Sequence, residues 1–316
     1  MTPHDDGHHH NHHDHHHHHG HEHVHAVQAN ADRRYLTIAL VLIVGFMAFE
    51  IVVGILAHSL ALLSDAGHML TDAAALLMSL LVIRIVQRPS GGHYTYGFRR
   101  AEVLSGQANG AVLLVLGALV IYEAISRLFH PPEVAGALVT IVAAVGIVVN
   151  VVAAWVLAKA NRESLNVEGS FQHIITDLYA FIGTFVAGLV ILVTGFDRAD
   201  AIASLFVAGL MIRSGYVLQR KAMRVLLERA PQDLVPTDIG WAMAHAEHVR
   251  EVHDLHLWEL APGHPILTAH VLVAPKMDCH AIRRALDQML ATRFNIPHTT
   301  LQVEHAHEPI VPISRP

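Results

Sequence analysis

Long apolar stretches alternate with short polar connections through the middle of the chain. Each stretch is close to the ~20 residues that an α-helix needs to cross the hydrocarbon core of a bilayer. The stretches run over about 35–57, 61–85, 101–129, 134–158, 168–194 and 200–219. The pattern therefore predicts a membrane domain at 33–224 that is an all-α bundle of six helices.

Beyond Pro231 the pattern changes to that of a small soluble domain, which we place at 225–316. β-branched residues on either side of the turn 262–265 predict a hairpin, and Asp278 is a suitable N-cap for a helix. The expected elements are a helix over 237–248, strands over 251–260 and 266–274, a helix over 279–294 and a strand over 299–304. This order predicts a small α+β layer.

The composition supports a membrane protein. Apolar residues make up 53% of the 316 residues and charged residues only 15%, which is more apolar surface than one soluble core can bury. The net charge of −6 and the lack of a basic stripe argue against a nucleic-acid partner. The single cysteine, Cys279, excludes an intrachain disulfide and suits a domain in a reducing cytosol.

Histidine is unusually frequent, and many of the 29 histidines lie near the N-terminus. The segment 1–32 has no apolar periodicity, so we expect a disordered, cytosolic tail that gathers metal. A cloning tag is the alternative, although Asn11, Asp14 and Glu22 break the histidine runs irregularly. The polar start is also unlike a cleavable signal peptide.

Basic residues cluster on alternate connections between the spans. The clusters are Arg33 and Arg34; Arg84, Arg88, Arg99 and Arg100; Lys159 and Arg162; and Arg220, Lys221 and Arg224. By the positive-inside rule, both termini are expected in the cytosol, with the chain in the cell membrane. The second and fifth spans then run antiparallel.

Two of these spans carry an ionisable pair with the same spacing. His68 and Asp72 lie four residues apart in the second span, and His173 and Asp177 repeat the spacing in the fifth. Such a pair shares one helix face, and ionisable groups in a membrane are costly unless they serve a site. Two imidazoles and two carboxylates make a complete tetrahedral set for Zn²⁺. The alternative is that each side chain caps or hydrogen-bonds a neighbouring helix.

Four motifs add to this pattern: SLALLSDAGHMLTD at 59–72, YGFRRAE at 96–102, HIITD at 173–177 and HDLHLW at 253–258. Together they resemble the cation diffusion facilitators, most closely the bacterial zinc exporters. The resemblance implies a homodimer whose cytosolic domain is ferredoxin-like, similar to a metallochaperone. It implies that the two His-x-x-x-Asp pairs form the transport site, and that the protein is not an enzyme.

The resemblance also implies a second zinc site in the cytosolic domain. Its ligands would correspond to His253 and His270, completed by Glu304, with His280 bridging two ions. His305 and His307 are alternatives or additions to Glu304. A charge link near the cytosolic surface would correspond to Arg100 and Glu228.

The expected function is efflux of zinc in exchange for protons by alternating access. Metal ligands must be deprotonated, so protons and metal compete for the site. The alternative is a membrane metal sensor or binding scaffold that does not transport. Ligand type favours Zn²⁺ and leaves Cd²⁺, Co²⁺, Ni²⁺ and Mn²⁺ open as further substrates.

Overall fold

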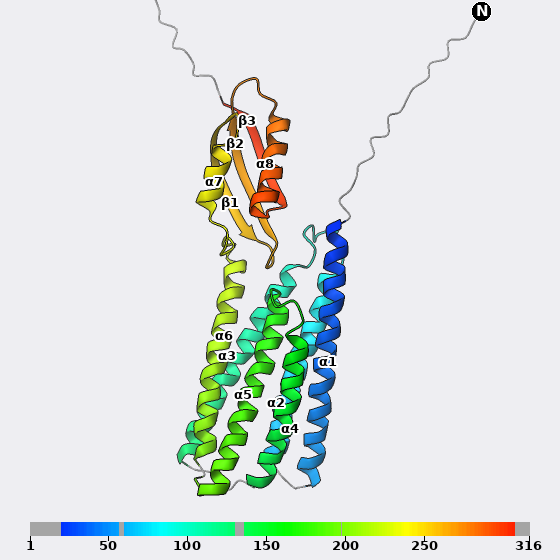
Figure 1. Cartoon of the computed structure of the whole chain (residues 1–316), viewed down its shortest axis with the longest axis vertical. Coiled ribbons are helices and arrows are strands. Elements are labelled where there is room, and N and C mark those ends of the chain that lie inside the picture. Colours follow the sequence, from blue (N-terminus) through cyan, green and yellow to red (C-terminus); the bar gives the residue numbers. More distant parts are fainter. Residues whose placement is uncertain (1–19, 57–59, 130–135, 197, 307–316) are drawn as a thin grey trace, which may run out of the picture.

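The chain folds into a helical bundle with a small domain beyond one of its ends (Figure 1). The structure is a computed structural model that describes residues 20–56, 60–129, 136–196 and 198–306. Within these ranges, the side chains of 20–31, 60–65, 67–68, 136 and 138–139 are outside the description.

Six helices form the bundle, and each includes a stretch long and apolar enough to cross a membrane. They are α1 (Gly20–Leu56), α2 (Leu60–Val86), α3 (Arg100–Phe129), α4 (Gly136–Leu157), α5 (Leu165–Thr194) and α6 (Ala199–Leu226). The six-helix prediction is confirmed, and most boundaries lie within a few residues of those expected.

The first helix begins earlier than expected. Since α1 starts at Gly20, the expectation of disorder over the whole of 1–32 is wrong for 20–32. Once the apolar span has nucleated a helix, the Ala, Gln and Glu residues that precede it extend the helix at little cost. Residues 1–19, with most of the His runs, lie outside the described residues.

α3 and α6 pack closely because glycines lie where they cross. A Cβ atom on Gly215 would lie 2.9 Å from the carbonyl oxygen of Gly110, so the two backbones are nearly in contact there. Small residues permit such close approach between membrane helices. α6 also continues to Leu226, beyond the apolar stretch that ends near 219, and so carries basic residues past the bundle.

The C-terminal domain has the predicted order of elements. It consists of α7 (Pro236–Ala244), β1 (Val249–Glu259), β2 (Pro265–Val273), α8 (Cys279–Phe294) and β3 (His298–His305). β2 is the central strand, antiparallel to β1 and parallel to β3. This is the ferredoxin-like order β-α-β-β-α-β without its first strand.

One face of the sheet is covered and the other is open. Leu267 and Val271 of β2 are fully buried against Leu286 of α8 and Met243 of α7. Alternate residues of β2, including His270, lie on the opposite face and are only half-buried. Asp278 is the N-cap of α8, as expected: its carboxylate accepts hydrogen bonds from the backbone N–H groups of residues 280 and 281, and these bonds lower its pKa.

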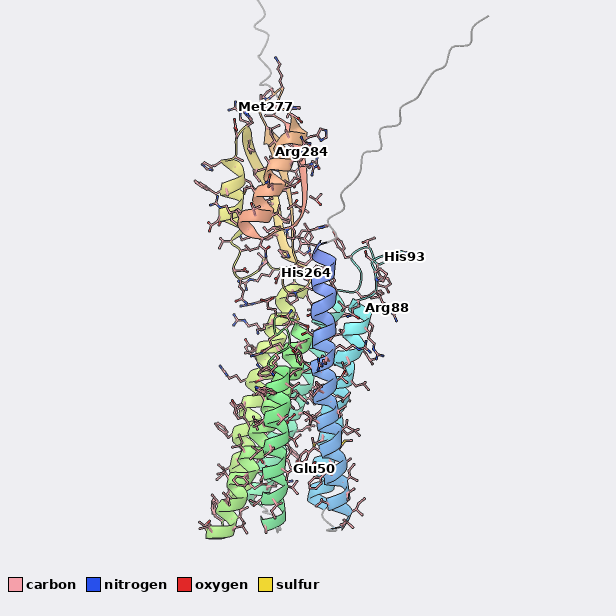
Figure 2. The ribbon with its side chains drawn as sticks, turned by 45° about the vertical axis from the view of Figure 1, so that its right-hand side comes forward. Glu50, Arg88, His93, His264, Met277 and Arg284 are labelled. Carbon is pink, nitrogen blue, oxygen red and sulfur yellow. The ribbon has the colours of Figure 1, made fainter. Side chains whose placement is uncertain are left out.

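The tip of the β1–β2 hairpin meets the bundle. Ala261 at this tip is 1% exposed and packs with Val103 of α3, Leu165 of α5 and Ala222 of α6. Figure 2 shows His264, three residues along, at this junction, with Glu50 at the other end of the bundle. The turn between β1 and β2 therefore forms a contact between the C-terminal domain and the helical bundle.

A charge pair lies at the same end of the bundle. Arg100 Nη2, at the start of α3, lies 2.9 Å from Glu228 Oε1, just after α6. The predicted link between these residues is confirmed as a contact within the chain. Both side chains are exposed, so the pair contributes only ~0–1 kcal/mol and acts mainly by positioning the domain.

Candidate metal sites

Three of the four residues predicted for the transport site lie together inside the bundle. Asp72 of α2 and His173 and Asp177 of α5 each offer a ligand atom, and these atoms lie within 4.8 Å of one another. Within the described residues, no other group of three or more His, Cys, Asp or Glu side chains meets this criterion. The spacing that predicted a shared face therefore predicted the cluster.

Burial and hydrogen bonding make this cluster unusual for a membrane interior. His173 is 4% exposed and Asp72 is 8% exposed. His173 Nε2 donates to Asp72 Oδ1 at 2.6 Å, across the two helices. Such a contact offsets the cost of burying the carboxylate. It also holds two potential metal ligands side by side.

His68 is the fourth predicted ligand, and its position is known only from its place along α2. It lies four residues before Asp72 within α2, while its side chain is outside the described residues. Ligand atoms ~2.0–2.1 Å from a tetrahedral zinc would lie roughly 3.3 Å apart. The described three therefore need only small side-chain movements to hold an ion.

A belt of small polar side chains lies next to the cluster, toward the C-terminal domain. Ser79 of α2 and Ser170 of α5 hydrogen-bond each other at 2.8 Å, and Asn166 Nδ2 donates to the carbonyl of Ser79 at 3.0 Å. Ser105 of α3 donates to the side chain of Asn166. All four residues are at most 3% exposed. The belt ties α2, α3 and α5 together and closes this side of the cluster.

The spacing of polar residues in the sequence indicates this belt, although the sequence analysis did not identify it. Asn166, Ser170, His173 and Asp177 follow one another at intervals of four, three and four residues, so they form a single stripe along α5. Ser79 lies two helical turns from Asp72 on α2. A search for polar residues in phase with the ionisable pairs would have found both.

The two predicted hairpin histidines also lie together. His253 and His270 are directly opposite each other in β1 and β2, and their rings stack with centroids 5.2 Å apart. A bulge follows His253, and there Asp254 adopts a left-handed backbone conformation, with φ of 52°. Its carboxylate lies 3.9 Å from His270 Nε2 and 3.0 Å from His256 Nε2. Asp254 is a possible ligand that the sequence analysis did not single out.

The other residues predicted for this second site divide between two faces of the sheet. Glu304 is opposite Leu272 in the register, so it lies on the open face, diagonal to His270. His305 is opposite Val273 on the covered face, where its Nε2 lies 3.6 Å from Cys279 Sγ and donates to the carbonyl of Met277.

The structure therefore keeps Glu304 and separates His305 from the hairpin pair. His280 is exposed in the first turn of α8, on the helical side of the sheet, and does not join the pair within one chain. His307 lies outside the described residues. Two imidazoles with Asp254 or Glu304 form a donor set that suits zinc.

The hairpin tip carries one perturbed carboxyl group. Burial raises the pKa of Glu259, the backbone N–H of Gly263 at 3.3 Å partly offsets this rise, and the nearby carboxylate of Asp233 adds to it. Glu259 is therefore a carboxyl group near the apolar junction whose burial favours its protonated form.

Comparison with known proteins matches both units. The family model of the cation efflux transmembrane domain matches residues 36–227, and that of the cation efflux protein cytoplasmic domain matches 237–306. The chain is 35% identical to the cadmium, cobalt and zinc/H(+)-K(+) antiporter of Bacillus velezensis, over 88% of this chain and 90% of the relative. It is 37% identical to the zinc transporter ZitB of Escherichia coli, over 83% and 84%. It is 34% identical to the metal cation efflux system protein CzcD of Cupriavidus metallidurans, over 88% of each.

Replacing His173 with Ala should weaken zinc binding in the bundle. Loss of a ligand's hydrogen-bond partner typically lowers metal affinity roughly 10–100-fold. Loss of the ligand itself should therefore lower zinc affinity more than about 100-fold. The measurement is competition for zinc against a chelator, in a background where His253 and His270 are both Ala. The control is Thr176→Val, because Thr176 is similarly buried on α5 and its one side-chain hydrogen bond within the described part of the chain goes to the carbonyl of Gln172. Equal affinities of the two variants would remove His173 from the site.

Proposed function

The chain belongs to the cation efflux family, and we propose that it is a zinc efflux transporter whose site is His68, Asp72, His173 and Asp177. The observation that carries the proposal is the buried cluster of three ligand groups between α2 and α5. The names of all three relatives describe transport of zinc or of metal cations.

The donor set favours Zn²⁺ over other ions. Imidazole and carboxylate ligands suit a small borderline ion in tetrahedral geometry, and two carboxylates neutralise its double charge inside the membrane. Cd²⁺ and Co²⁺ accept similar ligands, and they are named with zinc for the Bacillus relative. We therefore place them as secondary substrates of the same site.

Proton exchange follows from the contact between His173 and Asp72. The hydrogen bond at 2.6 Å holds one proton on His173 Nε2, between two atoms that must both be free of protons to bind a metal ion. Zinc that enters the site therefore displaces protons, and protons that arrive from the other side displace zinc. The polar belt closes the bundle toward the C-terminal domain, so access from that side requires α2 and α5 to separate there. These features support alternating access as a Zn²⁺/H⁺ antiporter.

We place the protein in the cell membrane as a homodimer with both termini in the cytosol. The basic connections all lie at the end of the bundle that carries the C-terminal domain, as the positive-inside rule requires. The open sheet face, with His253 and His270, is a surface that a second chain can cover.

Asp177→Ala should abolish zinc transport, because it removes both a ligand and one of the charges that neutralise the ion. The measurement is zinc uptake into proteoliposomes with a pH-sensitive dye inside. Wild-type protein should move protons against zinc and should slow when the pH gradient is collapsed, while Asp177→Ala should match protein-free vesicles.

Thr176→Val, one residue away, is the control and should transport normally. Transport by Asp177→Ala near the wild-type rate would contradict the assignment of the site. Absence of flux in folded wild-type protein would instead favour the non-transporting sensor.

We further propose that zinc bound by His253 and His270 regulates transport through the hairpin tip. Both residues lie on the two strands that end in this tip, and the tip packs against Leu165, the first residue of α5. His173 lies eight residues further along the same helix. A metal that fixes the hairpin would therefore bias α5 through a continuous set of packed groups.

Ala261→Asp should uncouple the two units, since it buries a carboxylate in the apolar junction. In wild-type background, changing His253 and His270 to Ala should alter the dependence of flux on cytosolic zinc. In the Ala261→Asp background the same change should have no further effect.

The control is Ala285→Asp, which makes the same substitution at an exposed position of α8. If the histidine variants act equally in all three backgrounds, the hairpin tip does not transmit the signal.

A further inference from the structure

A cavity between α5 and α6 is lined by charged residues that the transport site does not use. Its volume is about 130 Å³, and its wall includes Glu168 and Gln172 of α5 and Arg213, Ser214 and Lys221 of α6. Arg213 is notable because it lies within the apolar span of α6. A charged group inside a membrane span is by default a sign of function.

The charge of the cavity is positive. Glu168 is already neutralised, since Arg162 Nε lies 3.0 Å and Gln172 Nε2 lies 2.8 Å from its carboxylate. Arg213 and Lys221 are exposed, and neither has a hydrogen bond or ion pair within the described part of the chain. Two cations thus face the cavity without a protein partner, which excludes a metal site and favours an anion.

The cavity lies near the end of the bundle that carries the C-terminal domain. Glu168 is three residues from the start of α5, and the neighbouring Gly169 packs against Leu218 of α6. α6 has 28 residues and is thus ~42 Å long, longer than the ~30 Å hydrocarbon core. The side chain of Arg213 can therefore extend along α6 to reach the headgroup level.

The size and surroundings of the cavity limit the ligand. It is smaller than the ~300–1,000 Å³ of pockets for small organic molecules, so it suits a phosphate group whose remainder lies outside. Tyr216 and Val217 of α6, next to it, are exposed apolar side chains that acyl chains can cover. Basic pockets between membrane helices on the cytosolic side bind lipid headgroups.

We propose that this cavity, at Arg213, Ser214 and Lys221, binds the phosphate of an anionic phospholipid from the cytosolic leaflet. The ligand bridges α5, which carries two transport ligands, and α6, which packs on α3. Lipid binding at this site is independent of zinc and of transport, so its test does not rest on the proposed function.

The test is native mass spectrometry of delipidated full-length protein, titrated with phosphatidylglycerol or with phosphatidylcholine of the same acyl chains. Wild type should bind phosphatidylglycerol more tightly. The double variant Arg213→Gln/Lys221→Gln should bind phosphatidylglycerol roughly 30-fold more weakly, from the usual contribution of two basic residues near a membrane surface. Its phosphatidylcholine binding should not change.

Two further variants control for lost charge and for misfolding. Arg84→Gln/Arg88→Gln removes the same charge from exposed residues at the end of α2 on the same side, and should bind like wild type. Ser214→Leu fills the cavity and keeps both charges, and should still weaken phosphatidylglycerol binding.

Several outcomes would overturn the proposal. These are equal affinity of wild type for the two lipids, equal losses in the Arg84/Arg88 control, or unchanged binding in Ser214→Leu. Displacement of the lipid by millimolar inorganic phosphate would assign the cavity to a soluble anion. If lipid bound to monomers and not to dimers, a second copy of the chain would cover this face in the dimer.

Discussion

The cost of ionisable groups in a membrane interior governs this structure. A charged group in the hydrocarbon core costs several kcal/mol unless it is paired or hydrated. Asp72 and His173 meet this constraint by bonding each other across α2 and α5. The same constraint makes them candidate metal ligands, because a zinc ion can replace the shared proton and satisfy both groups. If the pair binds zinc as we propose, stability without metal and affinity for metal depend on the same two residues.

The neighbouring polar residues extend this principle. The belt of Ser79, Ser105, Asn166 and Ser170 places hydrogen-bonded groups where apolar side chains would otherwise pack. Hydrogen bonds of this kind contribute about 0.6–2 kcal/mol each in membranes. They are strong enough to hold the helices together and weak enough to break when α2 and α5 separate. If apolar side chains occupied these positions, an ion and its water molecules would meet no polar groups there.

α5 connects the parts of the molecule. Its first residue packs with the hairpin tip of the C-terminal domain, its next turns carry the belt and face the cationic cavity, and its middle carries two candidate metal ligands. A helix is stiff over this length, so a displacement at one end reaches the other. Glycines bring α3 close to α6 at Gly110 and Gly215 and close to α5 at Gly106 and Gly169, so α3 is packed tightly against both helices.

The sequence predicted the features that depend on local pattern. Apolar length predicted the six spans, and the four-residue spacing predicted that His173 and Asp177 share a face. Asp278 capped its helix as expected. Features that depend on contacts between distant segments were missed. Asp254 became a neighbour of His270 only through a bulge, and the separation of His305 from Glu304 follows from the strand register. The burial of Ala261 between three membrane helices depends on the docking of two units, which no local pattern encodes.

X-ray absorption at the zinc edge would identify the atoms that bind zinc inside the bundle. The sample is full-length protein loaded with one zinc per chain, with His253 and His270 changed to Ala and residues 1–19 deleted to remove competing histidines. A zinc ion held by two histidines and two aspartates should show four light ligands at about 2.0–2.2 Å, two of which have the scattering pattern of imidazole rings. A six-coordinate oxygen shell, or a sulfur ligand at about 2.3 Å, would contradict the site formed by α2 and α5.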